Sequence, residues 1–145
     1  MSLTPRFSIH HPGRTLCTLA LLAVFNTAAA ENLTGAEKIL CAPTGVNICA
    51  NDGACVSALP WEVNVPQFIE VDFKEKHLAT TEASDRNRVT PFESISREDG
   101  VIYLQGVENG RAFSFVINES TGFMTAAVAR DSLTVTGFGV CTPTD

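Results

Sequence analysis

The chain has 145 residues, 45% of them hydrophobic and 18% charged, which excludes a disordered polypeptide and fits one small globular domain. Its formal net charge of −6 argues against nucleic-acid binding, which needs a basic footprint. No apolar run reaches the roughly 18 residues of a membrane-spanning helix, and the sequence contains no phosphate-loop or dinucleotide-binding motif, so we expect no cofactor.

The N-terminal segment has the order of a secretory signal peptide. Arg6 and Arg14, with no acid among them, precede the apolar stretch 16–25, and small residues follow up to Ala30. We therefore expect residues 1–30 to be cleaved and residues 31–145 to form a single domain that is periplasmic or secreted. Cleavage removes two arginines and no acid, so the formal charge becomes −8.

Cleavage also removes Cys17, which leaves an even number of cysteines. Four cysteines allow three pairings. We favour Cys49–Cys55, which closes a turn-rich loop, and Cys41–Cys141, which ties the first element to the last, while the other pairings stay open. We expect no metal site, because the sequence has no C-x2-C pair and exported thiols tend to oxidise.

The first half of the domain predicts short strands separated by loops. We expect a strand over 38–42, a cysteine-held loop over 43–59 and an irregular link over 60–66 between two prolines. Alternation over 67–73 predicts a strand with Ile69, Val71 and Phe73 on its apolar face. A polar turn at 74–76 and a returning strand over 77–81 complete this part.

In the second half of the domain, after a charged loop over 82–88, turn residues recur at regular intervals between the predicted strands. Strands are predicted over 89–96, 101–107, 112–118, 123–129 and 133–141, with hairpin turns at Asp99-Gly100 and Asn109-Gly110. The whole pattern predicts an all-β fold: a disulfide-stapled antiparallel meander of about seven or eight strands, closed as a small barrel or sandwich. Gly137 and Gly139 predict a bulge or bend in the last strand. The predicted core is Ile69, Val71, Leu104, Phe113, Phe115, Ile117, Val128 and Phe138.

Few residues suggest catalysis. The mature chain has one histidine, His77, which we interpret as a surface residue of a strand. Glu70 and Asp72 are spaced for one face of a strand, which we interpret as a solvated sheet face, and Glu98-Asp99 as hairpin-turn chemistry. Asn51-Asp52-Gly53 resembles part of a calcium loop but lacks its other acids, so we interpret it as a turn. We expect no enzyme, and name no catalytic, cofactor-binding or metal residues.

Binding is the alternative to catalysis, and two segments are candidates for a partner. Trp61, the only tryptophan, either caps the core or is an exposed anchor. The charged loop contributes Asp85, Arg86 and Arg88, and loops of this kind often carry function. The acidic balance would favour cationic partners.

The cysteine pattern C-x7-C-x5-C, in Cys41, Cys49 and Cys55, with Phe138-Gly-Val-Cys141 near the end, resembles small exported bacterial β-proteins of uncharacterised function. That resemblance implies a periplasmic β-domain and no activity. The architecture is also similar to periplasmic lysozyme inhibitors, although 120–123 (Ser-Thr-Gly-Phe) departs from their Ser-Gly and Tyr motif.

These observations lead to three hypotheses. The first is an exported, non-enzymatic β-domain that binds a protein or an envelope component in the manner of an inhibitor. The second is a small-ligand carrier with a barrel cavity lined by Phe113, Phe115 and Phe138. The third is a hydrolase that uses the Glu70 and Asp72 carboxylates. The partner and the oligomeric state do not follow from the sequence.

Overall fold

The fold is all-β and antiparallel, as predicted, and its strands form one sheet. The computed structural model describes residues 32–84 and 87–144, so the predicted signal peptide lies outside the described residues. Within them, two short 3-10 helices join the strands, η1 (Pro60–Val63) and η2 (Glu82–Ser84). The strands are β1 (Lys38–Ala50), β2 (Cys55–Ala58), β3 (Ile69–Asp72), β4 (His77–Thr80), β5 (Val89–Pro91), β6 (Ser94–Glu98), β7 (Val101–Glu108), β8 (Arg111–Asn118), β9 (Phe123–Arg130) and β10 (Leu133–Pro143). Neither 3-10 helix, nor any other helix in these ranges, has the length and hydropathy of a membrane span.

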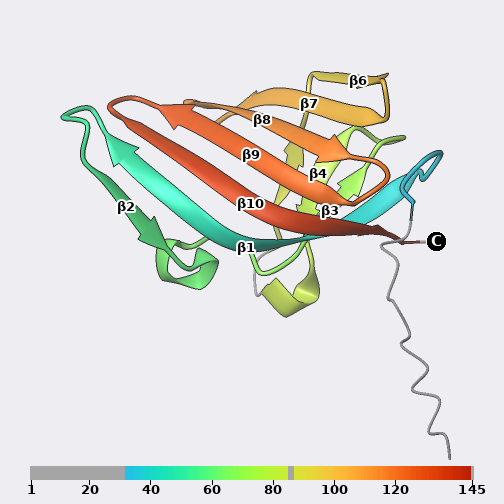
Figure 1. The fold of residues 1–145 in the computed structure, drawn as a ribbon, viewed down its shortest axis with the longest axis horizontal. Coiled ribbons are helices and arrows are strands. Elements are labelled where there is room, and N and C mark those ends of the chain that lie inside the picture. Colours follow the sequence, from blue (N-terminus) through green and yellow to red (C-terminus); the bar gives the residue numbers. More distant parts are fainter. Residues whose placement is uncertain (1–31, 85–86, 145) are drawn as a thin grey trace, which may run out of the picture.

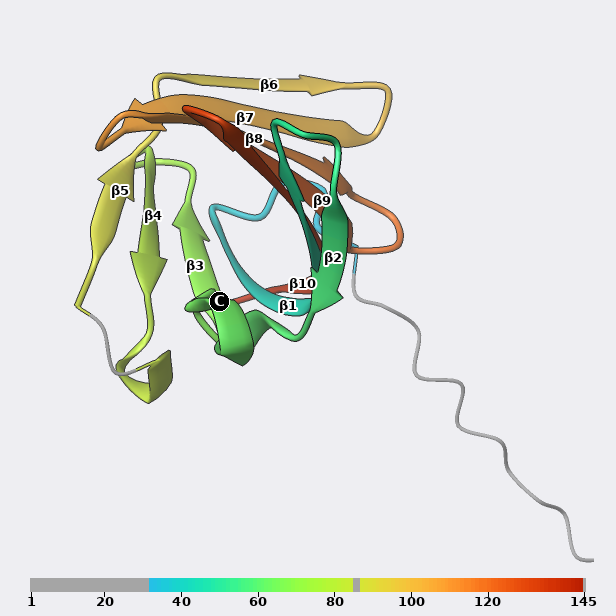
Figure 2. The same ribbon diagram turned by 90° about the vertical axis from the view of Figure 1, so that its left-hand side faces the viewer.

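The sheet curls into a half-barrel (Figure 1). Its strand order is β5-β4-β3-β1-β10-β9-β8-β7-β6, and β2 pairs with β1 outside this path. In Figure 2, β6, β7 and β8 form one side of the curl, while β3, β4 and β5 descend opposite them. The two edge strands, β5 and β6, are consecutive in the chain. In the connection between them, the Phe92 amide donates to the Lys76 carbonyl (3.0 Å) and the Glu93 amide donates to the Gln105 carbonyl (2.8 Å). The connection at 92–93 therefore crosses from one edge of the sheet to the other.

Turn chemistry sets the hairpins of the second half. Asp99 and Gly100 both have positive φ, at 52° and 76°, as do Asn109 and Gly110, at 50° and 73°. Two successive positive φ angles define the type I′ turn, whose twist matches that of the flanking strands. Both predicted hairpin turns are confirmed, and they place β6, β7 and β8 side by side.

The expected loop over 43–59 is wrong. β1 continues to Ala50, and β2 follows as the second arm of a hairpin. The reason is tertiary: β10 offers a pairing partner along the whole of β1, from Ile39 opposite Pro143 to Ala50 opposite Leu133. Backbone groups that find such partners stay extended even where glycine, asparagine and alanine lower the intrinsic strand propensity.

Two further boundaries differ from the prediction. The expected strand over 89–96 is two strands, β5 and β6, because residues 92 and 93 bond to opposite edges of the sheet. This division, together with β2, brings the described strands to ten. The predicted irregularity in the last strand lies on its partner instead: the register of β1 shifts between Pro43 and Gly45, opposite Gly139 and Phe138.

The core is largely as predicted. Val71, Leu104 and Ile117 are fully buried, Phe113 and Phe115 are buried, and Ile69 and Val128 are partly buried against them. Phe138 is the exception, with 46% of its surface exposed. Its neighbours Gly137 and Gly139 take the inward positions of β10, where an added Cβ on Gly139 would lie 2.8 Å from Met124 Cε. Since side chains alternate along a strand, Phe138 faces outward.

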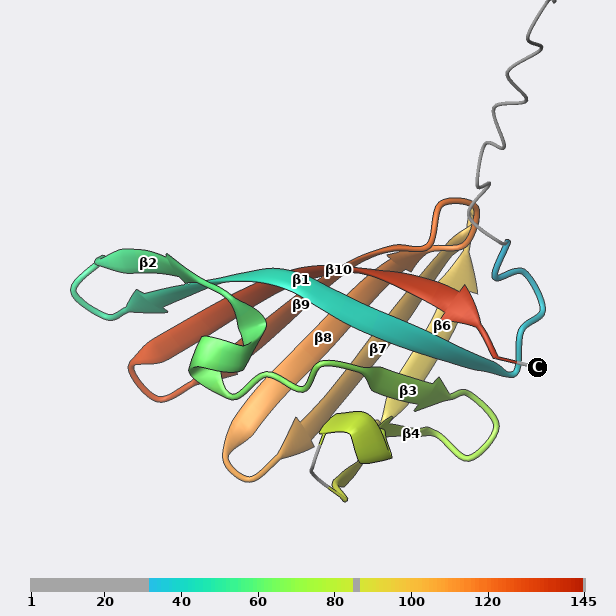
Figure 3. The same ribbon diagram turned by 90° about the horizontal axis from the view of Figure 1, so that it is seen from below.

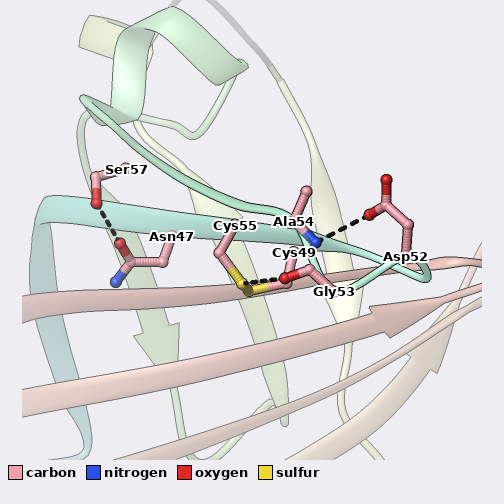
Figure 4. Close-up of a disulfide and its surroundings, with 7 residues drawn as sticks. All are labelled: Asn47, Cys49, Asp52, Gly53, Ala54, Cys55 and Ser57. Atoms are coloured by element: carbon pink, nitrogen blue, oxygen red, sulfur yellow. Dashed lines mark hydrogen bonds between the residues drawn. A yellow bond between two sulfur atoms is a disulfide. The ribbon is translucent and has the colours of Figure 1, made fainter.

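Both favoured disulfides are present, Cys41–Cys141 and Cys49–Cys55. Each joins residues directly opposite one another in neighbouring strands. Figure 4 shows the second at the end of the β1–β2 hairpin, where Asp52 Oδ1 accepts a hydrogen bond from the Ala54 amide (2.9 Å). The Asn51-Asp52-Gly53 segment is thus a turn, as interpreted from the sequence.

Candidate functional site

The interior of the half-barrel is filled at one end and hollow at the other. At the filled end, Ile39, Ile102, Leu104 and Ile117 are completely buried. The hollow end is a cavity of about 370 Å³, which lies within the range of small-molecule sites. Figure 3 shows the segment between η1 and β3 crossing in front of β8 and β7, and Val63 at the end of η1 together with residues 64–66 of this segment forms part of the cavity wall.

Side chains at alternate positions of β8 and β9 face the cavity and form part of its wall. On β8, Phe113 and Phe115 face inward, and on β9, Met124, Ala126 and Val128 do. Besides three arginines, Asn64, Thr80 and Thr90, every lining residue is apolar. Among the described residues, no Asp, Glu, His or Cys lines the cavity. The wall is therefore suited to hold an apolar group.

One end of the cavity carries charge. Glu108 on β7 lies opposite Arg111 on β8, and Arg111 lies opposite Arg130 on β9, so three adjacent strands present one row of ionic side chains. Arg88, from the chain just before β5, joins the row by an ion pair with Glu108 Oε2. Arg88, Arg111 and Arg130 all line the cavity, and they are three of the four arginines in the described ranges.

Glu108 is the acid that holds this row together. Besides Arg88, it accepts a hydrogen bond from Thr90 Oγ1 (2.9 Å) and lies 3.5 Å from Arg111 Nη2. The hydrogen bond from Arg88, aided by that from Thr90 and by the nearby arginine charges, holds the pKa of Glu108 below its usual value. Glu108 is consequently ionised at neutral pH and cannot act as a general acid.

Two donors in the row lack partners. The buried Nε of Arg111 has no hydrogen-bond partner. Arg130 is exposed and forms no ion pair with any residue that the structure describes. Arginines directly opposite one another in a sheet repel, and Glu108 balances one of the three positive charges. The row is therefore poised to accept a negative group.

Glu70 and Asp72, the acidic pair considered for hydrolysis, do not both lie on a solvated sheet face as we expected. Asp72 is 1% exposed rather than on a solvated face, and it pairs with Lys38 Nζ at 2.8 Å, whereas Glu70 lies 4.0 Å from the same nitrogen. Hydrogen bonds from the Glu75 amide and from Lys38 hold the pKa of Asp72 below its usual value. Such a carboxylate stays ionised and stabilises β1 against β3. Within residues 32–84 and 87–144, no three metal-ligating side chains cluster.

The structure describes two of the four predicted partner-binding residues, Trp61 and Arg88. Trp61 lies on η1 with 72% of its surface exposed, so the core-capping interpretation is wrong, and its role as an anchor for a partner stays a prediction. The reason is that Pro60, and not Trp61, is the buried residue of that helix. Arg88 lines the cavity and pairs with Glu108, while Asp85 and Arg86 lie outside the described residues.

Sequence analysis missed Glu108, Arg111 and Arg130. The signal was available, since residues 108 and 111 flank the predicted Asn109-Gly110 turn and must pair across it. Arg111 is also in phase with Phe113 and Phe115, which places its side chain on the inner face.

No family model, curated protein or solved structure matches this chain.

Proposed function

We propose that this protein is an exported, non-enzymatic binding domain that carries a small apolar ligand or envelope component inside its curled sheet. The observation that carries the proposal is the cavity of about 370 Å³, whose wall is apolar apart from one ionic end. Well-packed domains leave few voids larger than a water molecule. A hollow of this size, next to a completely packed region, therefore supports a binding role.

The two disulfides and the N-terminal segment support export. Disulfides persist in oxidising compartments, such as the periplasm or the extracellular space, and both join paired strands of this sheet. The order of charged, apolar and small residues before Glu31 is that of a signal peptide. The cavity wall offers no acid–base set among the described residues, which favours carrying a ligand over transforming it.

The test is a titration of the oxidised protein with N-phenyl-1-naphthylamine, a neutral apolar probe that fluoresces in apolar surroundings. We expect saturable binding of one probe per chain. Ala126→Phe fills the cavity, because Ala126 lies on its wall between Phe115 and Gly137, and should weaken binding at least tenfold.

Ala127→Phe is the matched control. Ala127 is the next residue on β9 and is exposed on the opposite face of the sheet, so the same added side chain leaves the cavity open. The probe should bind this variant as it binds the wild type. Absence of saturable binding to the wild type, or equal loss in both variants, would contradict the proposal.

A protein partner is the second candidate function, and the exposure of Trp61 favours it. A tryptophan with 72% of its surface exposed offers a large apolar contact area to a partner, and tryptophan is enriched among residues that dominate binding energy at interfaces. This candidate also agrees with the resemblance of the sequence to small exported β-proteins and, in architecture, to periplasmic lysozyme inhibitors.

Native mass spectrometry of the protein from its own envelope fraction tests this candidate. A stoichiometric protein adduct that disappears in Trp61→Ala and persists in Val56→Ala would support it. Val56 is a suitable control because it is also exposed, at 62%. A protein adduct unaffected by Trp61→Ala would remove Trp61 from the interface.

A further inference from the structure

The row of ionic side chains at one end of the cavity differs in charge from the rest of this chain. The protein is acidic as a whole, with 16 Asp and Glu against 10 Lys and Arg. At this one place three arginines line the cavity, and the single carboxylate beside them, that of Glu108, pairs with two of them, Arg88 and Arg111. Two positive charges are thus left over beside an apolar wall, and buried or half-buried charge is expensive unless it is paired.

The excess positive charge lies on directly paired positions, because Arg111 shares the Glu108 carboxylate with Arg88 and Arg130 has no ion pair among the described residues. Arg111 and Arg130 are opposite one another on β8 and β9, and both line the cavity. Side chains at paired positions start about 5 Å apart on the same face. Their guanidinium groups can therefore converge on one oxyanion, for which the planar donor fork of arginine is well suited.

The state of the donors agrees with this interpretation. Arg111 Nε is buried without a hydrogen-bond partner, and buried polar groups in native proteins are nearly always bonded. Arg130 is exposed, which places the positive charge where the cavity meets solvent. An anionic head at this end would lie beside both guanidinium groups and offset their positive charge.

The geometry points to a single-chain amphipathic anion as the ligand, with its apolar chain inside the curl and its carboxylate or phosphate head between Arg111 and Arg130. This inference rests on the proposed function and specifies its ligand. A cavity of about 370 Å³ lies near the lower limit of small-molecule sites. That volume favours one medium-length chain over the two acyl chains of a phospholipid.

Calorimetric titration with ligands that share one chain and differ in head group tests the inference. Dodecanoate and dodecyl phosphate carry an anionic head, dodecan-1-ol a neutral one and dodecyltrimethylammonium a cationic one. Used as monomers, the two anions should bind the oxidised protein at least tenfold more tightly than the alcohol, and the cation should bind most weakly. Added salt should weaken the anions selectively, because it screens exposed charges.

Substitutions of the two arginines test where the anionic head group of the ligand binds. Arg111→Gln and Arg130→Gln should each weaken dodecanoate binding about tenfold, the size expected for one charge-assisted hydrogen bond, and leave dodecan-1-ol binding unchanged. Lys74→Gln is the matched control, because it removes the same charge from an exposed turn outside the cavity. Circular dichroism establishes that each variant is folded.

The outcomes separate the two proposals. Equal affinity for dodecanoate and dodecan-1-ol, unchanged by Arg130→Gln, would overturn the anionic head and leave the apolar carrier intact. Failure of every ligand, together with failure of the neutral naphthylamine probe, would overturn both. Flotation with phosphatidylglycerol vesicles, without binding of the monomers, would assign the anion to a membrane surface and overturn the single-chain ligand.

Discussion

The two disulfides stabilise the fold to different extents, which gives a quantitative prediction. Cys41–Cys141 joins residues 100 apart in the chain, and Cys49–Cys55 joins residues 6 apart. A cross-link restricts the unfolded chain in proportion to the logarithm of the loop it closes. With these separations, the chain-entropy relation gives about 4.7 kcal/mol for the first bridge and about 2.2 kcal/mol for the second.

The burial of the cysteines also predicts a larger loss of stability when the Cys41–Cys141 bridge is removed. Cys41 is completely buried and Cys141 is 6% exposed, and both belong to the hydrophobic core, whereas Cys55 is exposed on β2. Replacing the first pair with alanine also removes packed sulfur atoms from the core, which adds to the loss. The double variant Cys41→Ala/Cys141→Ala should therefore lose at least 2 kcal/mol more than Cys49→Ala/Cys55→Ala.

Urea unfolding of the oxidised wild type and both double variants measures the difference. Each variant should keep a single cooperative transition, with a lower midpoint and a larger slope, because the released unfolded chain exposes more surface. Equal losses in the two variants, or a larger loss for Cys49→Ala/Cys55→Ala, would refute the loop-entropy reasoning.

Two further predictions concern stability. Asp72→Asn should cost about 1 kcal/mol at neutral pH, because it weakens the ion pair with half-exposed Lys38. Since the pKa of Asp72 is lowered in the folded protein, its stabilisation is present above the unfolded value of 3.8 and is lost as pH falls through the folded value. Urea midpoints between pH 7 and pH 2 should converge for wild type and variant, and a constant gap would contradict the assignment. Gly122→Ala should cost about 3 kcal/mol and Gly110→Ala about 1 kcal/mol in thermal unfolding. Both glycines have positive φ, but an added Cβ at Gly122 would lie 2.3 Å from the Cys141 carbonyl oxygen, while that at Gly110 meets open space; equal costs would show that the contact is relieved cheaply.

Several elements followed from local pattern. The alternation over 112–118 predicted β8 with Phe113, Phe115 and Ile117 inward, and all three are buried. The predicted disulfide pairs are those in the structure. The extended β1, by contrast, depends on β10, which begins more than eighty residues later in the chain. No local propensity reports a partner at that separation.

The candidate site was only partly predictable for the same reason. Phe113 and Phe115 were predicted to line a cavity and do so, while Phe138 faces outward because glycines occupy the inner positions of β10. Arg88 was named as part of a loop that binds a partner, yet its charge is paired with Glu108 at the cavity. That pairing arises from the curl of the sheet, which brings the chain before β5 to the end of β7.

The sequence by itself determined the class of fold, the hairpins and the residues that face inward along each of the longer strands. Those features depend on side-chain alternation and on turn residues with positive φ, and both act over a few neighbouring residues. The tertiary structure alone decided that β1 pairs with β10 along its whole length, that the sheet stays hollow at one end and that Arg111 lies opposite Arg130 there. These features arise when distant strands pair and curl, so the charge and volume of the cavity are properties of the assembled sheet rather than of any one segment.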